Sequence, residues 1–146
     1  MPDTQPVTIL LVEDDPGHAR LIERNLRRAR ITNEIIMLTD GQVAVDYLCG
    51  EGLRRPLPLL ILLDLNLPGL SGFQVLERLK ADGQTKHIPV ICLTTTDNPQ
   101  DIERCYALGC NVYITKPIAY EQFAEVIRQL GLLLSIVKIP QGGATA

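Results

Sequence analysis

Four short polar segments in this chain each follow an apolar run, and together they carry carboxylates, hydroxyls and one ammonium. The segments are Glu13-Asp14-Asp15, Asp64, Thr94-Thr95-Thr96 and Thr115-Lys116-Pro117. If the apolar runs are parallel strands of one sheet, their carboxyl ends share one edge, where such sheets bind ligands. Carboxylates, a hydroxyl and one ammonium would then occupy a small volume. That combination is typical of a Mg²⁺-assisted phosphoryl site.

The expected chemistry divides among these side chains. Mg²⁺ usually takes one or two carboxylates together with waters and phosphate oxygens, so Glu13 and Asp14 predict a direct and a water-mediated ligand, with Asp64 as a third. A carboxylate in that setting can attack phosphorus and form an acyl phosphate. Two carboxylates about 4 Å apart repel by about 4 kcal/mol at an effective dielectric of about 20. Mg²⁺ and Lys116 would offset that repulsion, and the Thr94 hydroxyl could then hydrogen-bond a phosphoryl oxygen.

Each of these residues also has a purely structural interpretation. Asp14 and Asp15 could both cap a helix, and for Asp15 the cap is the favoured interpretation. Asp64 could belong to a turn, the threonines could simply end a strand, and Lys116 could be a solvated loop lysine. Four such coincidences at one sheet edge are less credible than a site. His18 and His87 stand apart from the polar segments, so we expect both at the surface.

The elements that must position these residues alternate between strand and helix. The expected strands are Thr8–Val12, Glu34–Leu38, Leu59–Leu63, Val90–Leu93 and Val112–Thr115. Most are nearly continuous apolar runs, as expected for parallel strands that are covered on both faces. Strand–helix alternation with right-handed crossovers predicts an α/β fold with a doubly wound, five-stranded parallel sheet and five helices.

Helix-start and helix-stop signals lie between the strands. The expected starts are Asp15-Pro16, Asp40, Ser71, Asn98-Pro99 and Ala119. A side-chain oxygen before the first turn accepts from free backbone N–H groups, and proline suits the first helical position. Gly83 and Gly109 are the expected stops, because glycine tolerates the left-handed conformation at a helix C-terminus.

Length and composition exclude several classes of protein. The chain of 146 residues has a formal net charge of −3, so it lacks the basic surplus of nucleic-acid-binding domains. No run of apolar residues is long enough to span a membrane, and the N-terminus does not resemble a signal peptide. Cys49, Cys92, Cys105 and Cys110 lack metal-ligand spacing, so we expect reduced structural cysteines and a cytoplasmic protein.

The sequence divides into a domain at residues 1–130 and an extension at residues 131–146. The apolar stripe of the last helix continues as far as Pro140, and a stub rich in glycine, alanine and threonine follows. The extension could pack against the core of its own domain. Alternatively, it could form an exposed apolar arm that a partner buries.

The segments LLVEDD, ILLDLNLPGLSG, PVICLTT and YITKP, in this order and at this spacing, resemble the receiver domain of bacterial response regulators. The resemblance covers about Val7 to Leu130. It implies the flavodoxin-like strand order 2-1-3-4-5, and it implies a phosphoprotein of a two-component system rather than an enzyme. Asp64 would be the phosphoacceptor of a sensor histidine kinase. Glu13 and Asp14 match the acidic pair that binds Mg²⁺.

The same resemblance implies further roles. Asn66 matches the residue whose main-chain carbonyl binds Mg²⁺, and Lys116 matches the lysine that pairs with the phosphoryl group. Thr94 and Tyr113 match the switch residues, through which phosphorylation changes the face of helix four, strand five and helix five. Pro117 matches a proline that typically follows a cis peptide bond.

A narrower resemblance rests on VEDD, ILLDLNLPGLSG, LTTTDN and the C-terminal extension. These segments look like the stand-alone regulators that pair with bacterial and cyanobacterial phytochromes. The resemblance implies a phytochrome-type kinase as partner. It also implies a homodimer through the face of the last helices or through exchanged C-terminal arms.

Arginines crowd the first helix of this acidic chain: Arg20, Arg24, Arg27, Arg28 and Arg30. They could form a solvated face that pairs with Glu23, or they could dock the kinase.

Three other functions remain to be weighed. An aspartyl phosphatase usually has a second aspartate where Asn66 stands, a flavin binder would want a phosphate loop in place of the acidic segment, and a pseudo-receiver would lack part of the site.

Overall fold

A computed structural model of the chain describes residues 8–49, 58, 60–117 and 119–129. It contains a five-stranded sheet in the order β2-β1-β3-β4-β5, with every adjacent pair parallel. The strands are β1 (Thr8–Val12), β2 (Glu34–Leu38), β3 (Leu60–Asp64), β4 (Val90–Thr94) and β5 (Val112–Thr115). The predicted strand order and the doubly wound fold are therefore confirmed.

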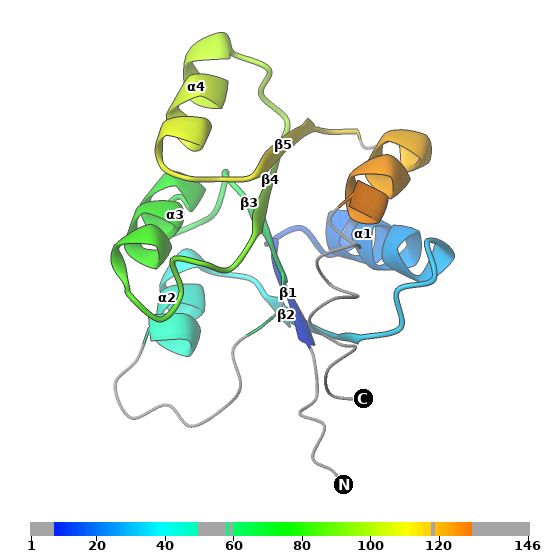
Figure 1. Cartoon of the computed structure of the whole chain (residues 1–146), viewed down its shortest axis with the longest axis horizontal. Coiled ribbons are helices and arrows are strands. Elements are labelled where there is room, and N and C mark those ends of the chain that lie inside the picture. The colour runs from blue at the N-terminus through cyan, green and yellow to red at the C-terminus, as the bar shows by residue number, and fades with distance from the viewer. Residues whose placement is uncertain (1–7, 50–57, 59, 118, 130–146) are drawn as a thin grey trace, which may run out of the picture.

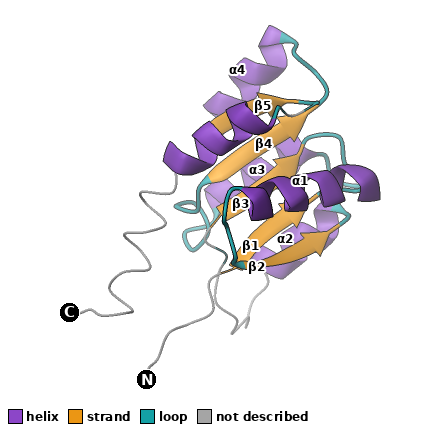
Figure 2. Ribbon diagram, turned by 90° about the vertical axis from the view of Figure 1, so that its right-hand side faces the viewer, coloured by secondary structure: helices purple, strands orange, loops and turns teal. Residues whose placement is uncertain are grey.

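Helices cover both faces of the sheet, as Figure 1 and Figure 2 show. The labelled helices are α1 (Pro16–Arg28), α2 (Gly41–Cys49), α3 (Gly72–Ala81) and α4 (Pro99–Ala107), and residues 120–129 form the last helix. Helix α1 and the last helix lie on one face, and α2, α3 and α4 lie on the other (Figure 2). The extension at residues 131–146 lies outside the described residues.

Alternating strand residues build two separate cores, one on each face of the sheet. Ile9 and Leu11 of β1 pack with α1 and with Phe123 of the last helix. Leu10 and Val12, which point to the opposite face, pack with α2, α3 and α4. Both faces of β1, β3 and β4 are almost fully buried, and this explains why their sequences are nearly continuous apolar runs.

Two strands end one residue later than the sequence predicted, and the difference concerns the site. We expected β3 and β4 to end at Leu63 and Leu93, but they end at Asp64 and Thr94. Asp64 pairs with Leu93 in the register of β3 and β4, and the Leu65 N–H donates to the Leu93 carbonyl at 3.2 Å. The polar side chains are thus held by the sheet itself.

The local signals for helix ends are largely confirmed. Asp15 caps α1, because its Oδ1 accepts from the backbone N–H groups of Gly17 at 2.8 Å and His18 at 3.1 Å. These backbone bonds, that of His18 foremost, lower the pKa of Asp15. Ser71 forms a capping box with Gln74.

The C-terminal signals are confirmed at α4 and approximate at α3. Gly109 has φ of +107°, and the Cys110 N–H donates to the Cys105 carbonyl at 3.0 Å, as in a Schellman motif. Helix α3 ends at Ala81 with Asp82 as its C-cap, so it stops before the expected Gly83.

One glycine allows the strand end and α3 to come together. A Cβ atom added to Gly72 would lie 2.4 Å from the Asp64 carbonyl oxygen and 2.4 Å from Leu65 Cα. Any larger residue would therefore push the start of α3 away from the end of β3. The position of the Asp64 backbone depends on this close approach.

The cysteines are free, as predicted. Cys92, Cys105 and Cys110 are buried and Cys49 is partly buried, and none forms a disulfide. Within the described part of the chain, no helix is long and apolar enough to cross a membrane.

Candidate functional site

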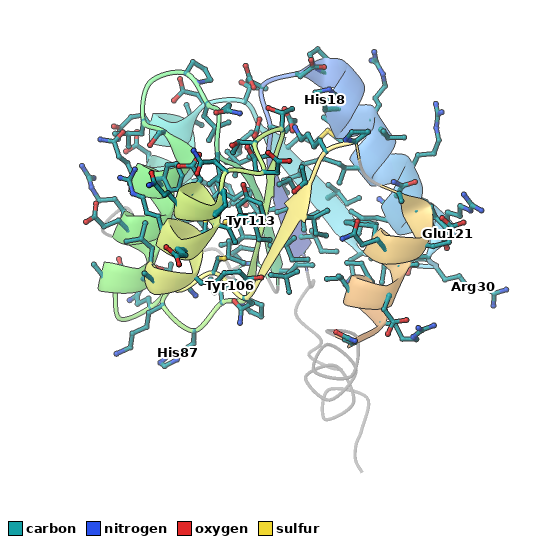
Figure 3. The ribbon with its side chains drawn as sticks, turned by 90° about the horizontal axis from the view of Figure 1, so that it is seen from above. His18, Arg30, His87, Tyr106, Tyr113 and Glu121 are labelled. Atoms are coloured by element: carbon teal, nitrogen blue, oxygen red, sulfur yellow. The ribbon has the colours of Figure 1, made fainter. Side chains whose placement is uncertain are left out.

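The carboxyl edge of the sheet holds a cavity of about 220 Å³ whose lining is mostly polar and charged. It is lined by Glu13, Asp14, Asp15, His18, Asp64, Asn66, Thr95 and Lys116. These residues follow or end β1, β3, β4 and β5, or begin α1, so the convergence expected from the sequence occurs. Figure 3 looks down on the molecule from above Figure 1, with His18 of α1 and Tyr113 of β5 labelled.

Three carboxylates gather closely enough to hold one cation. Glu13, Asp14 and Asp64 each offer an oxygen atom, and these atoms lie within 4.8 Å of one another. Glu13 and Asp64 are buried, whereas Asp14 is exposed. Oxygen ligands of this kind suit hard divalent cations such as Mg²⁺ and Mn²⁺. The donor set therefore fits a divalent metal.

Lys116 supplies the positive charge that lies among these carboxylates. Its Nζ donates to Glu13 Oε1 at 2.6 Å and lies 3.6 Å from Asp64 Oδ2. The side chains of all three residues are at least nine-tenths buried. One ammonium cannot balance two buried carboxylates and the nearby Asp14, so the cluster keeps a net negative charge that a cation would neutralise.

The pKa of the Asp64 carboxyl reflects its burial and this charge imbalance. Burial raises its pKa to about 6, and the negative charge of Glu13 adds to the rise. The Asn66 backbone N–H, which donates to Asp64 Oδ1 at 3.2 Å, and the Lys116 ammonium both act in the opposite direction. Ionised Asp64 is therefore under-compensated by the protein alone, and a bound divalent cation would favour its ionised form.

Asn66 joins the end of β3 to the end of β4. Its side-chain amide donates to the hydroxyl oxygens of Thr94 and Thr95, at 3.4 Å in each case. Asn66 also lines the cavity, but its expected role as a main-chain ligand stays a prediction. As an amide without a titratable proton, it cannot serve as the general acid of an aspartyl phosphatase.

The threonines after β4 occupy different environments. Thr94 is fully buried, and its Oγ1 accepts from the Thr96 N–H at 3.3 Å. Thr95 is exposed and lines the cavity. The expected switch hydroxyl of Thr94 thus lies behind the cavity lining, where it is held by the loop that leads to α4.

Tyr113 connects β5 to the same loop. Its hydroxyl donates to the Thr96 carbonyl at 2.6 Å. The ring is partly buried, and burial is the main cause that raises the pKa of its phenol to about 12. The loop between β4 and α4 is therefore held in this structure both by Thr94 and by Tyr113.

The Lys116–Pro117 peptide bond is cis, as the resemblance implied. Lys116 itself is tied to the neighbouring strand, because its backbone N–H donates to the Thr94 carbonyl at 2.7 Å. The lysine and the expected switch threonine thus share a backbone hydrogen bond at the edge of the sheet.

The expectation that His18 is isolated is wrong, although its side chain is 45% exposed, in line with the expected surface position. Its Nδ1 lies 3.1 Å from Lys116 Nζ and 3.9 Å from Glu13 Oε2. The error arose because Lys116 is distant in sequence and close only in the fold. A local signal did exist: His18 is in the first turn of a helix whose cap, Asp15, belongs to the acidic segment. His87 is exposed, as expected.

The arginines of α1 are exposed, but two of them have structural partners. Arg27 donates to the backbone carbonyls of Ile31 at 2.9 Å and Asn33 at 2.7 Å. Arg28 lies over the ring of Tyr120, 3.7 Å from its centroid, and so links α1 to the last helix. For Arg27 and Arg28, these contacts take the place of the expected pairing with Glu23. Arg20 and Arg24 are therefore better candidates than Arg27 and Arg28 for contact with a partner.

Comparison with known proteins gives consistent relatives. Residues 9–128 match the response regulator receiver domain family. A receiver domain from Rhodospirillum rubrum is 51% identical with a TM-score of 0.73, and the match covers 92% of this chain and 98% of that one. The phosphorylated cyanobacterial phytochrome response regulator RcpA is 38% identical with a TM-score of 0.75, covering 89% of this chain and 95% of RcpA.

A third relative is response regulator Rcp1 of Synechocystis sp. (strain ATCC 27184 / PCC 6803 / Kazusa). It is 44% identical over 113 residues, which are 76% of this chain and 77% of Rcp1. Its Mn²⁺-bound structure has a TM-score of 0.74 at 38% identity, covering 88% of this chain and 94% of that one. The family match spans most of the described sheet and helices, and these relatives share the fold. The chain therefore belongs to the response regulator receiver domain family.

Proposed function

We propose that this protein is a phosphorylatable signalling module that accepts a phosphoryl group on Asp64 from a histidine kinase, in a reaction that depends on Mg²⁺. The observation that carries the proposal is the environment of the Asp64 carboxylate. It ends a buried strand, lies 3.6 Å from the Lys116 ammonium and shares a 4.8 Å cluster with Glu13 and Asp14. A nucleophile, a cation site and a fixed positive charge are thus adjacent.

The residues divide the work of the transfer. An Asp64 oxygen would attack the phosphorus of a phosphohistidine, so that an O–P bond forms as the N–P bond breaks and the imidazole leaves. Glu13, Asp14, Asp64 and the Asn66 carbonyl would hold Mg²⁺, which neutralises charge on the phosphoryl oxygens when it is bound. Lys116 would contact the phosphoryl group once it is on Asp64. The Mn²⁺-bound form of Rcp1 and the phosphorylated form of RcpA support metal binding and phosphorylation in this family.

The switch would act through the loop between β4 and α4. Phosphorylation adds a charge of about −1.5 to −2 and strong acceptor oxygens. A phosphoryl oxygen on Asp64 would accept from the Thr94 hydroxyl, and turning this hydroxyl toward the phosphoryl group would disturb the bond that its oxygen accepts from the Thr96 N–H. Since Tyr113 donates to the Thr96 carbonyl, the loop would carry that change to α4, β5 and the last helix. We propose that this face forms homodimer or partner contacts, and that the extension at residues 131–146 contributes to them as an arm.

The partner we propose is a phytochrome-type sensor histidine kinase. RcpA is a cyanobacterial phytochrome response regulator, and its fold and sequence are similar to those of this protein over most of both chains. Exposed Arg20 and Arg24 on α1 would contribute to docking. Reversing both charges should slow transfer from the kinase more than labelling by acetyl phosphate. Equal slowing of both reactions would count against docking through α1.

Labelling tests the site directly. Wild-type protein should take up label from acetyl phosphate only with Mg²⁺ present, and Asp64→Asn should abolish it. Asp46→Asn is the matched control, because Asp46 is an exposed carboxylate on α2 that accepts from the Gln42 side-chain amide at 2.9 Å. Persistent labelling of the Asp64→Asn protein would show that the phosphoacceptor lies elsewhere. Light scattering with and without beryllofluoride and Mg²⁺ tests the dimer, and a monomer in both states would exclude it.

A further inference from the structure

His18 and Lys116 stand together between two hollows at the edge of the sheet. Both residues line the acidic cavity of about 220 Å³, and both line an apolar cavity of about 160 Å³ with Leu21, Ile22 and Pro117. His18 is on α1 and Lys116 follows β5, so the pair also bridges two elements that are distant in sequence. Figure 3 shows His18 at this edge and His87 at the opposite side of the molecule.

The contact between them has one chemically sensible form. His18 Nδ1 is 3.1 Å from Lys116 Nζ. A lysine ammonium has three donors and no acceptor, so Nδ1 must be the acceptor and the imidazole must be neutral with its proton on Nε2. Two donors facing each other at this distance would repel. The structure therefore assigns His18 as a hydrogen-bond acceptor for the charged lysine.

The Lys116 ammonium lies at different distances from Asp64 and from its other neighbours. The Lys116 ammonium is within hydrogen-bonding distance of Glu13 at 2.6 Å and of His18 at 3.1 Å, but it is 3.6 Å from Asp64. His18 Nδ1 itself lies 3.9 Å from Glu13 and 4.0 Å from Asp15. Both carboxylates belong to the segment that joins β1 to α1. The contacts with Glu13 and His18 therefore hold the ammonium closer to these two residues than to Asp64.

We propose that His18 is a positioning residue that holds Lys116 in its resting position and thereby weakens the response of the site to a phosphoryl group. The inference rests on the proposed function. When a phosphoryl group is on Asp64, Lys116 must turn toward it, and the bond to His18 must break. The His18 side chain is 45% exposed, so water replaces part of that bond. A net hydrogen bond of this kind corresponds to roughly a 3- to 10-fold change in affinity.

The test compares two substitutions at one position. His18→Leu removes the acceptor and keeps an apolar wall. His18→Asn retains an acceptor, because the amide oxygen of asparagine is bonded to Cγ as Nδ1 is in histidine. His87→Leu, at an exposed position far from the site, is the matched control. The measurement is the dissociation constant of beryllofluoride at saturating Mg²⁺, by calorimetry, with thermal unfolding recorded for each variant.

His18→Leu should bind beryllofluoride roughly 3- to 10-fold more tightly than wild type, whereas His18→Asn and His87→Leu should stay within about 2-fold of it. Unchanged or weaker binding by His18→Leu would overturn the inference while leaving the proposed function intact. If wild-type protein itself fails to bind beryllofluoride with Mg²⁺, the proposed function fails first.

A spectroscopic readout separates positioning from a general structural role. The ring-nitrogen NMR shifts of His18 should show protonation on Nε2 in wild type. They should change when Lys116 is replaced by methionine, because the partner of Nδ1 is then lost. Protonation on Nδ1 in the wild-type protein would contradict the assigned hydrogen bond and with it the inference.

Discussion

Replacing Asp64 by asparagine should stabilise the metal-free protein at pH 8. This outcome runs against the usual effect of core substitutions, most of which destabilise. The reason lies in the environment of the carboxyl: it is buried and faces the negative charge of Glu13. At pH 8 it must be ionised in the folded state without full compensation. Asparagine has nearly the same shape and carries no charge.

The magnitude follows from the pKa of the group. The pKa of Asp64 rises from 3.8 to about 6 on folding, and each pKa unit corresponds to about 1.4 kcal/mol. The ionised carboxylate therefore destabilises the fold by up to about 3 kcal/mol above pH 6. The folded state binds more protons than the unfolded state between the two values, so stability falls as the pH rises from 3.8 to about 6. Since the asparagine NH₂ group also needs a partner, we expect a gain of about 1–3 kcal/mol.

Urea unfolding followed by circular dichroism in EDTA measures this difference. The stability gap between Asp64→Asn and wild type should be largest near pH 8 and fall below about 1 kcal/mol at pH 4, where Asp64 is largely protonated in the folded state. Adding Mg²⁺ should stabilise wild type by mass action and should stabilise the variant less, because one ligand is lost. Asp46→Asn should show neither effect.

The reasoning would be refuted if Asp64→Asn were less stable than wild type at pH 8 in EDTA. It would also fail if the stability gap did not depend on pH. Either result would mean that Lys116 and the Asn66 N–H compensate the carboxylate fully, and that the charge imbalance on which the proposed metal site depends does not exist.

Three further substitutions test other parts of the structure. Gly72→Ala should lower the free energy of unfolding by more than about 3 kcal/mol, because its Cβ would meet backbone atoms at 2.4 Å. Gly83→Ala, whose Cβ would have nothing within 4 Å, should be neutral or stabilising. Equal effects of the two substitutions in urea unfolding would refute this prediction. Tyr113→Phe removes the 2.6 Å bond to the loop after β4 and should destabilise by about 1 kcal/mol, and calorimetric unfolding showing no loss would mean that the bond does not hold the loop. Lys116→Met leaves two buried carboxylates without their ammonium, so it should destabilise the metal-free protein by about 3–5 kcal/mol. Mg²⁺ should recover part of this loss. A variant as stable as wild type in EDTA would disprove the stabilising role of the ion pair.

The fold could be predicted because its signals are local. The apolar runs at Ile9–Val12 and Leu60–Leu63 are buried on both faces, and a segment that must be apolar everywhere is visible without knowledge of its neighbours. Caps are equally local: the oxygen of Asp15 reaches N–H groups two and three residues away. Strand ends were less certain, since backbone pairing with a neighbouring strand decides whether Asp64 is the last residue of β3 or the first of a loop.

The residues of the site could be predicted from the sequence, but the contacts between them could be predicted less well. Parallel strands place their carboxyl ends together, so the gathering of Glu13, Asp64 and Lys116 follows from the topology. The topology does not determine whether Thr94 or Thr95 faces the cavity, because consecutive side chains at the end of a strand point to opposite sides. The structure places Thr95 in the cavity lining and buries Thr94 beneath it.

The amino-acid sequence by itself determined the alternation of elements, the helix caps and the set of oxygen-rich side chains at one edge, because each depends on residues close together in the chain. Only the tertiary structure decided which partners those side chains have. The contact between His18 and Lys116 joins residues 98 positions apart, and the raised pKa of Asp64 depends on the depth to which helices bury the end of β3. Distances and desolvation of this kind arise from packing in three dimensions, and the charge balance of the site follows from them.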